Sequence, residues 1–375
     1  MGETLRIAFV YDVIYPWVKG GVERRIHELA VRLARKHEVH VYGYKHWDGA
    51  PEIERNGVIY HGIVSPGSIY LAGKRNPLPM LRLASNLRKR LPELRKYDVV
   101  DVQNLFYPGA FVLRALPNAL LTWHESWGNY WFSYFGPAGI PGWAVERLLS
   151  DYRLHLAVSR KTQLDLLQVG VPSRVVPNGV DLERTDRVKP SECESDLVFV
   201  GRLVKDKNLE LAIRAVAGLV DDFPHVRFSI IGDGPERKNL ENLAMKLGIR
   251  KNVDFLGRLE SWEDVISLLK ASKVFAFPSR REGFGMAVLE AMAAGVPPVV
   301  LDSPMNAARF LVNEKSGLVL SGDRFADGLR LLLSENNLGK KLGRNARKKA
   351  EMFDWGKIVG TLAGIYLEFT SSLPR

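Results

Sequence analysis

The segment of residues 278–295, PSRREGFGMAVLEAMAAG, carries residue types that can bind a phosphorylated, hydroxyl-rich ligand. Gly283 and Gly285 free the backbone of an expected loop, and the helix expected after it presents N-terminal N–H groups suited to an anion. Glu282 lies in the loop, and Glu290 lies more than one turn into the helix. Two carboxylates so placed could accept hydrogen bonds from hydroxyl groups some distance apart, as on a sugar and a ribose. A simple helix cap is the alternative interpretation.

Glu290 stands among apolar residues of the expected helix, namely Met286, Leu289, Ala291, Met292 and Ala293. Carboxylates are seldom buried without a partner. We therefore expect Glu290 to have a bound partner.

A basic loop, GRLVKDKN at residues 201–208, follows an apolar run and precedes another expected helix. Arg202 supplies a planar fork, Lys207 a point charge and the helix N-terminus a favourable dipole, which together suit a diphosphate. Basic residues are also common in surface turns, so a plain turn is the alternative.

Gly20 and Gly21 precede the first expected helix and allow a ligand to approach the backbone closely. A plain strand-to-helix turn is the alternative. The chain lacks the GxGxxG motif of dinucleotide-binding folds and the GxxxxGK[ST] motif of P-loop proteins. Their absence disfavours a nicotinamide dehydrogenase and a P-loop NTPase.

The elements that must position these residues follow an alternating pattern. Short apolar runs predict strands near residues 5–11, 39–44, 99–102, 120–123 and 154–158, with a helix over 20–35. The pattern restarts with strands near 196–200, 226–231, 253–256, 274–278 and 298–301, separated by helices over 208–219, 237–247, 262–270 and 285–294. Strands alternating with helices predict two α/β domains with parallel sheets. Ligands of such sheets bind beyond the carboxyl ends of the strands.

The boundary between the two series is expected at the turn signal of residues 176–181, VPNGVD. The polar stretch that continues to residue 195 is typical of an interdomain linker. We therefore expect an N-terminal domain of residues 1–180, a C-terminal domain of residues 181–352 and an aromatic-rich helix over 353–375. The pattern allows this helix to pack on either domain, including back on the N-terminal one.

Composition and charge narrow the class of protein. With 375 residues, 46% apolar and 25% charged, the chain is typical of a globular protein and has no apolar run long enough to span a membrane. Its N-terminus lacks the order of a secretory signal, so we expect a cytoplasmic protein. The single cysteine, Cys193, excludes an intrachain disulfide.

The net charge of +11 is concentrated in residues 74–96. The cations of this basic stretch, where Glu93 is the only acidic residue, are Lys74, Arg75, Arg82, Arg88, Lys89, Arg90, Arg95 and Lys96. One interpretation is a solvated helix face, and the other is a patch for a phosphorylated acceptor or for acidic lipid headgroups. Nucleic acid is not expected, because no binding module accompanies the charge. An aromatic stretch over 123–143 could be core, an acceptor platform or a peripheral contact with the inner face of a membrane.

The spacing EGFGxxxxEAxAxG at 282–295, preceded by PNGVD at 177–181 and GRLxxxK at 201–207, closely resembles the retaining glycosyltransferases of family 4, also called glycosyl transferases group 1. The resemblance covers nearly the whole chain. It implies the α/β GT-B fold, in which two Rossmann-like parallel-sheet domains face a central cleft. It also implies transfer of a hexose of the mannose or glucose type, with retention, from a nucleoside-diphosphate sugar to a glycan, lipid-linked or phosphorylated acceptor.

The resemblance also assigns site residues. It implies catalytic roles for His124, Arg202, Lys207 and Glu282. It implies a donor-binding set formed by Gly20, Gly21, Gly201, Arg202, Lys207, Gly232, Leu256, Arg258, Glu282, Gly283, Phe284, Gly285, Met286 and Glu290. Within this set, Arg202 and Lys207 would hold the diphosphate, Glu282 the transferred sugar and Glu290 the ribose. No cofactor is expected, and the absence of an Asp-x-Asp pair predicts a metal-independent enzyme.

The chain departs from the family where a Gly-Gly-x-x-Glu loop is usual, since residues 303–309 read SPMNAAR. Pro304 removes a backbone donor, and Arg309 replaces the usual acid. Two other functions remain open at this point. One is a GT-B sugar-nucleotide epimerase, and the other is a non-catalytic sugar-nucleotide-binding subunit.

Overall fold

The computed structural model describes residues 3–71 and 74–373, which form two compact units. The first unit contains the chain up to Asn178 and the C-terminal segment that begins at Trp355. The second unit is Gly179–Asp354. Each division lies two residues from the boundary expected from the sequence, and the two units are described separately below.

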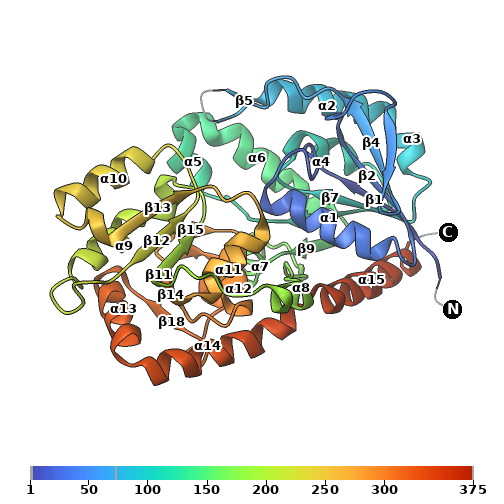
Figure 1. Ribbon diagram of the computed structural model, residues 1–375. Coiled ribbons are helices and arrows are strands. Elements are labelled where there is room, and N and C mark those ends of the chain that lie inside the picture. Colours follow the sequence, from blue (N-terminus) through green and yellow to red (C-terminus); the bar gives the residue numbers. More distant parts are fainter. Residues whose placement is uncertain (1–2, 72–73, 374–375) are drawn as a thin grey trace. The chain divides into compact units, whose positions relative to one another are not determined.

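The first unit is built on an eight-stranded sheet with the order β10-β9-β8-β7-β1-β2-β4-β3 (Figure 1). Its strands are β1 (Arg6–Val10), β2 (Glu38–Tyr44), β3 (Glu52–Arg55), β4 (Val58–Val64), β7 (Val99–Gln103), β8 (Ala119–Trp123), β9 (His155–Ala157) and β10 (Arg174–Val175). The central strands β1, β7 and β8 are buried along almost their whole length because helices cover both faces of a parallel sheet.

Strands β3 and β4 are an antiparallel hairpin at the sheet edge, which the sequence reasoning did not anticipate. The turn between them is Asn56-Gly57, with φ angles of 53° and 75°. Asn-Gly at positive φ is the preferred sequence for a two-residue hairpin turn. A second small antiparallel pair joins β5 (Tyr70–Leu71) to β6 (Lys74–Arg75).

The helices of the first unit are α1 (Gly21–Leu33), α2 (Pro77–Lys89), α3 (Leu91–Leu94), α4 (Tyr107–Leu113), α5 (Tyr130–Phe135), α6 (Ile140–Leu148), α7 (Arg160–Gln168) and α15 (Trp355–Ser371). The C-terminal helix α15 lies against α1 in this unit (Figure 1). Its buried face, which includes Trp355, Leu362 and Tyr366, belongs to the same hydrophobic core as the sheet.

The second unit has a six-stranded sheet with the order β13-β12-β11-β14-β16-β18, and every neighbouring pair is parallel (Figure 1). Its strands are β11 (Ser195–Val200), β12 (Phe228–Ile231), β13 (Val253–Gly257), β14 (Ser272–Phe277), β16 (Pro298–Leu301) and β18 (Leu318–Leu320). A separate short parallel pair joins β15 (Arg281–Glu282) to β17 (Met305–Asn306).

The helices of the second unit are α8 (Leu182–Arg187), α9 (Leu209–Ala217), α10 (Arg237–Lys246), α11 (Trp262–Lys270), α12 (Met286–Ala293), α13 (Phe325–Ser334) and α14 (Asn336–Ala350). The linker expected up to residue 195 is wrong in its first part, because α8 forms there. Asp181 caps this helix by accepting a hydrogen bond from the Arg184 N–H. Lys270 Nζ of α11 donates to the Val188 carbonyl oxygen at 2.7 Å, which ties the segment to the second unit.

Within the described ranges 3–71 and 74–373, the helices are all too short or too polar to cross a membrane. The aromatic stretch divides in two. Trp123 is part of the core, with 1% of its surface exposed, whereas Phe132, Tyr134 and Phe135 of α5 are exposed.

Candidate active site

The predicted donor-binding loops of the second unit follow adjacent parallel strands. Gly201 comes after β11, Gly232 after β12, Leu256 and Arg258 at or after the end of β13, and Glu282 shortly after β14. Because the carboxyl ends of parallel strands meet at one edge of the sheet, these residues gather on that edge. This edge is the place where an α/β sheet binds its ligand.

Gly201 and Gly232 hold the ends of β11, β12 and β13 in close backbone contact. The Gly201 N–H donates to the Ile231 carbonyl oxygen at 3.0 Å, and the Gly232 N–H donates to the Gly257 carbonyl oxygen at 2.7 Å. A Cβ atom on Gly232 would lie 1.9 Å from the Gly201 oxygen, and its φ of +135° is unfavourable for other residues. Position 232 therefore requires glycine.

Lys207 and Glu282 form an ion pair between these loops, through Lys207 Nζ and Glu282 Oε1. Their side chains are only 20% and 13% exposed. Ser279 Oγ donates to the same Glu282 oxygen at 2.9 Å, and Lys207 Nζ lies 5.4 Å from the ring centroid of Phe277. The pair thus places one cation and one carboxylate, each partly withdrawn from water, at the sheet edge.

Two further hydrogen bonds join the loops that carry this pair. The Arg280 N–H donates to the Asp206 carbonyl oxygen at 2.8 Å, and Asn208 Nδ2 donates to the Pro278 carbonyl oxygen at 3.2 Å. Asn208 has a φ of 51° and begins α9. Arg202, in contrast, is exposed. The structure thus joins Lys207 to Glu282 and leaves Arg202 at the surface.

The glycine-containing loop after Glu282 leads directly into α12. Gly285 caps this helix with a φ of +101°, and a Cβ atom there would lie 2.5 Å from Ala308 Cβ. The Phe284 side chain is buried and packs edge-on against Phe353, whereas Gly283 and Met286 are half-buried. The first N–H groups of a helix lack intrahelical acceptors, so the α12 N-terminus can receive an anion.

Glu290 is 6% exposed on the buried side of α12. The indole Nε1 of Trp262 donates to Glu290 Oε1 at 2.8 Å. The partner expected for this carboxylate is therefore a protein side chain, the Trp262 indole, at its Oε1 atom. Trp262 begins α11, which packs against α12.

The departure over residues 303–309 folds as strand β17 and a 3-10 helix rather than as an open loop. Asn306 lies opposite Glu282 in the β15–β17 pair and is fully buried. Asn306 Nδ2 donates to the carbonyl oxygens of Ser279 and Leu301 at 2.9 and 3.0 Å, and its Oδ1 accepts from the Ala308 N–H at 3.0 Å. This asparagine therefore holds the backbone around Glu282 where the usual glycine pair is missing.

The first unit places His124 directly after β8, with 6% of its surface exposed. Gln103 Nε2 donates to Asp101 Oδ1 at 2.8 Å, which leaves Gln103 Oε1 to accept from His124 Nε2 at 2.7 Å. Burial and the charge of Arg25 hold the pKa of His124 well below 6.5. His124 is thus a neutral imidazole with the proton on Nε2.

Asp101 anchors this network in the core. Thr122 Oγ1 and the Tyr366 hydroxyl donate to its carboxylate at 2.6 Å each. Burial raises the pKa of Asp101, and the hydrogen bonds from Thr122 and Tyr366 oppose that rise. The C-terminal helix α15 therefore supports the histidine through Tyr366.

Gly20 and Gly21 are exposed at the N-terminus of α1. Four residues further along the helix, Arg25 is buried, and its guanidinium donates to the Pro177 carbonyl oxygen at 2.6 Å and to Asn178 Oδ1 at 2.8 Å. The PNG motif of the sequence is thus attached to the same helix that carries the glycines.

Several buried or half-buried residues of these sites had no role predicted from the sequence, among them Asp101, Gln103, Trp262, Ser279 and Asn306. Ser279 and Asn306 stood inside segments that had been singled out, but their spacing does not reveal that Ser279 Oγ donates to Glu282 or that Asn306 bonds to the backbone of Ser279. Trp262 carried no sequence signal at all. Their roles depend on contacts that residue spacing does not reveal.

Two models of known protein families match the chain. Residues 19–184 match the model described as Glycosyltransferase Family 4, and residues 183–349 match the model described as Glycosyl transferases group 1. The chain belongs to the group 1, family 4 glycosyltransferases. The two matches confirm the resemblance found in the sequence, and they confirm that the protein is a glycosyltransferase.

The similar proteins align with different fractions of this chain. An uncharacterized glycosyltransferase of Methanocaldococcus jannaschii is 26% identical over 96% of this chain and 97% of its own length. A GDP-mannose-dependent alpha-(1-6)-phosphatidylinositol dimannoside mannosyltransferase of Mycobacterium tuberculosis is 32% identical over 58% of each chain. The solved structure of sucrose-phosphate synthase from Thermosynechococcus elongatus superposes with a TM-score of 0.79 at 18% identity, covering 98% of this chain and 100% of that one. That likeness confirms the expected fold class, the α/β GT-B fold with two Rossmann-like parallel-sheet domains.

Proposed function

We propose that this glycosyltransferase moves a hexosyl group of the mannose or glucose type from a nucleoside-diphosphate sugar to a glycan, lipid-linked or phosphorylated acceptor, with retention of anomeric configuration. The observation that supports this most is the partly buried Lys207–Glu282 pair at the carboxyl edge of the second sheet. A diphosphate needs a cation, and a sugar hydroxyl needs an acceptor. The pair offers both in one place.

In the proposed reaction, the bond between the anomeric carbon and the diphosphate oxygen breaks as the acceptor oxygen bonds to the same carbon from the same face. The acceptor proton passes to a donor phosphate oxygen. Lys207 and the N-terminus of α12 stabilise the charge that develops on the leaving diphosphate, with Arg202 as a second cation, and no metal ion is needed for this. Glu282 orients the transferred sugar by accepting from its hydroxyl groups. For His124 of the first unit we propose the role of a neutral hydrogen-bonding group in the reaction.

The donor is tested by thermal unfolding of the full chain with GDP-mannose, GDP-glucose, UDP-glucose and UDP-galactose, with and without EDTA. A matched donor raises the unfolding temperature by mass action, and EDTA leaves that rise unchanged. If none of the four shifts the transition, the proposed donor class is wrong. NMR of the product then gives its anomeric configuration, and an inverted anomer refutes the retaining reaction. Conversion of the donor without any acceptor indicates an epimerase instead.

The site assignment is tested by Lys207→Ala and Glu282→Ala, each of which we expect to abolish transfer while the protein stays folded. Lys205→Ala is the matched control, because Lys205 lies in the same 3-10 turn and is exposed. Near-normal turnover in either site variant, or equal loss in the control, contradicts the assignment.

We also propose that the first unit contacts an anionic membrane peripherally, at the cytoplasmic face. On α2, Leu78 and Leu81 are 71% and 54% exposed beside the exposed cations Arg82, Arg88 and Lys89. Helix α2 packs on α4, α4 on α6 and α6 on α5, so the exposed aromatic residues of α5 belong to the same group of helices. The side chains of Lys74 and Arg75 lie outside the described part of this basic stretch.

Co-sedimentation with vesicles tests this contact. We expect binding to vesicles that contain phosphatidylserine, weakening with salt, and loss of binding in the double variant Leu78→Ser and Leu81→Ser. Equal binding by the double variant and the unchanged protein contradicts the proposal.

A further inference from the structure

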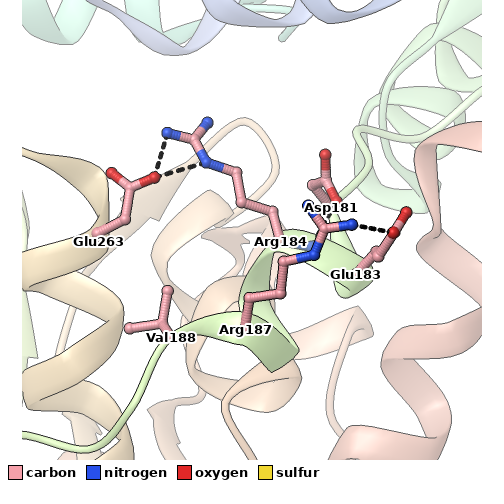
Figure 2. A pocket seen from close by; sticks show the side chains of 6 residues that line it. All are labelled: Asp181, Glu183, Arg184, Arg187, Val188 and Glu263. Carbon is pink, nitrogen blue, oxygen red and sulfur yellow. Dashed lines mark hydrogen bonds and ion pairs between the residues drawn. The ribbon is translucent and has the colours of Figure 1, made fainter.

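A pocket of about 550 Å³ lies beside the first helix of the second unit. Figure 2 shows the side chains that line it, which come from α8, from the residues flanking it and from α11. Arg184 of α8 reaches across to Glu263 of α11, with its Nε 2.7 Å from Glu263 Oε1 (Figure 2). The exposed Arg187 of the same helix turns to Glu183 instead.

Arg184 has a second contact through the face of its guanidinium. Its Cζ atom lies 4.7 Å from the ring centroid of Trp262, which is within the range of a cation–π interaction. The ion pair with Glu263 and the contact with Trp262 involve consecutive residues of α11. Arg184 therefore covers the indole and is itself held in place by the neighbouring carboxylate.

The start of α11 determines where this indole lies. Ser261 caps the helix by accepting from the Asp264 N–H at 3.0 Å, and Asp264 Oδ2 accepts in return from the Ser261 N–H at 3.3 Å. This capping box leaves Trp262 at the first helical position. The indole has only one polar hydrogen, and that hydrogen is directed to Glu290 Oε1 at 2.8 Å.

We propose that Trp262 is a positioning residue for the donor nucleoside: it orients the Glu290 carboxylate toward the ribose hydroxyls, and Arg184 fixes Trp262 in turn. This inference rests on the proposed function, in which Glu290 binds the ribose. A carboxylate on a helix has several rotamers, and a single N–H donor bound to one oxygen selects among them. Arg184 belongs to α8, the first helix of the second unit. Its contact with Trp262 therefore connects α8 to the proposed ribose-binding carboxylate, Glu290.

The test is calorimetric titration of the full chain with UDP, GDP and their 2′-deoxy and 3′-deoxy forms. Trp262→Phe keeps the ring and removes the N–H donor. We expect this variant to bind the better of the two ribonucleotides about tenfold more weakly, because a hydrogen bond to a charged group is lost. It should bind at least one of the matching deoxynucleotides almost as well as the unchanged protein does, so that the discrimination between ribose and deoxyribose shrinks by the same factor.

Arg184→Gln should shift the same ratio in the same direction by a smaller factor. Arg187→Gln is its matched control, since Arg187 belongs to the same helix and pairs with Glu183, and it should leave the ratio unchanged. Equal weakening of ribonucleotide and deoxynucleotide binding by Trp262→Phe overturns the proposal, since it means that the indole only fills space. Unchanged binding overturns it as well. If neither UDP nor GDP binds the unchanged protein, the donor class itself is wrong, and the role given to Trp262 fails with it.

Discussion

Replacement of Asn306 by leucine tests whether this residue stabilises the backbone around Glu282. The side chain is fully buried and makes three hydrogen bonds, to the carbonyl oxygens of Ser279 and Leu301 and to the Ala308 N–H. Leucine has a similar volume but no polar atoms, so all three backbone groups lose their side-chain partner. At about 1 kcal/mol for each bond, the second unit should lose about 3 kcal/mol of unfolding free energy.

That loss corresponds to a measurable change in unfolding temperature. For a unit of this size, about 1 kcal/mol lowers the midpoint by roughly 2–4 °C, so we expect a decrease of about 6–12 °C by differential scanning calorimetry. The control is Asn239→Leu, which makes the same chemical change at an exposed position of α10 and should shift the midpoint by less than about 2 °C. If the two variants unfold at the same temperature, Asn306 does not hold the loop as its contacts indicate.

Three other predictions concern the remaining sites. Folding lowers the pKa of His124, so below about pH 6.5 the unfolded chain binds a proton that the folded chain does not, and the unfolding free energy falls by about 1.4 kcal/mol per pH unit. The unfolding free energy of His124→Gln, measured between pH 7 and 5, should lack this contribution to the slope. An identical slope in the variant and the unchanged protein contradicts the buried neutral imidazole. Gly232→Ala should prevent the native packing of its loop, because a Cβ atom there would lie 1.9 Å from a backbone oxygen. The control is Gly21→Ala, whose added Cβ atom would have no neighbouring atom within 4 Å, so this variant should unfold at the temperature of the unchanged protein. Circular dichroism measures both unfolding temperatures, and equal values refute the clash. Tyr366→Phe should cost about 2 kcal/mol in urea unfolding because it removes the buried hydrogen bond to Asp101, and a cost below about 0.5 kcal/mol shows that the bond contributes little.

The sequence alone predicted the central strands of both sheets and the loops for which we propose donor binding. Apolar runs of four to six residues are buried on both sides by covering helices, so their pattern predicts strands β11, β12 and β14 without knowledge of the fold. Gly285 could be singled out because its positive φ is a property of the local chain. The hairpin at Asn56-Gly57 had an equally local signal that was overlooked.

What only the tertiary structure decided are the contacts between residues far apart in the chain. Lys207 and Glu282 are joined across two loops, Trp262 binds Glu290 from another helix, and Tyr366 reaches Asp101 from the C-terminal helix. Spacing along the sequence reports the conformation of a few consecutive residues, since steric restriction and hydrogen bonding of the backbone act over that range. Which side chains then meet depends on how whole helices and strands pack. For that reason the motif of Glu282 and Glu290 could be identified from the sequence, whereas the residues that hold these two carboxylates in place could not.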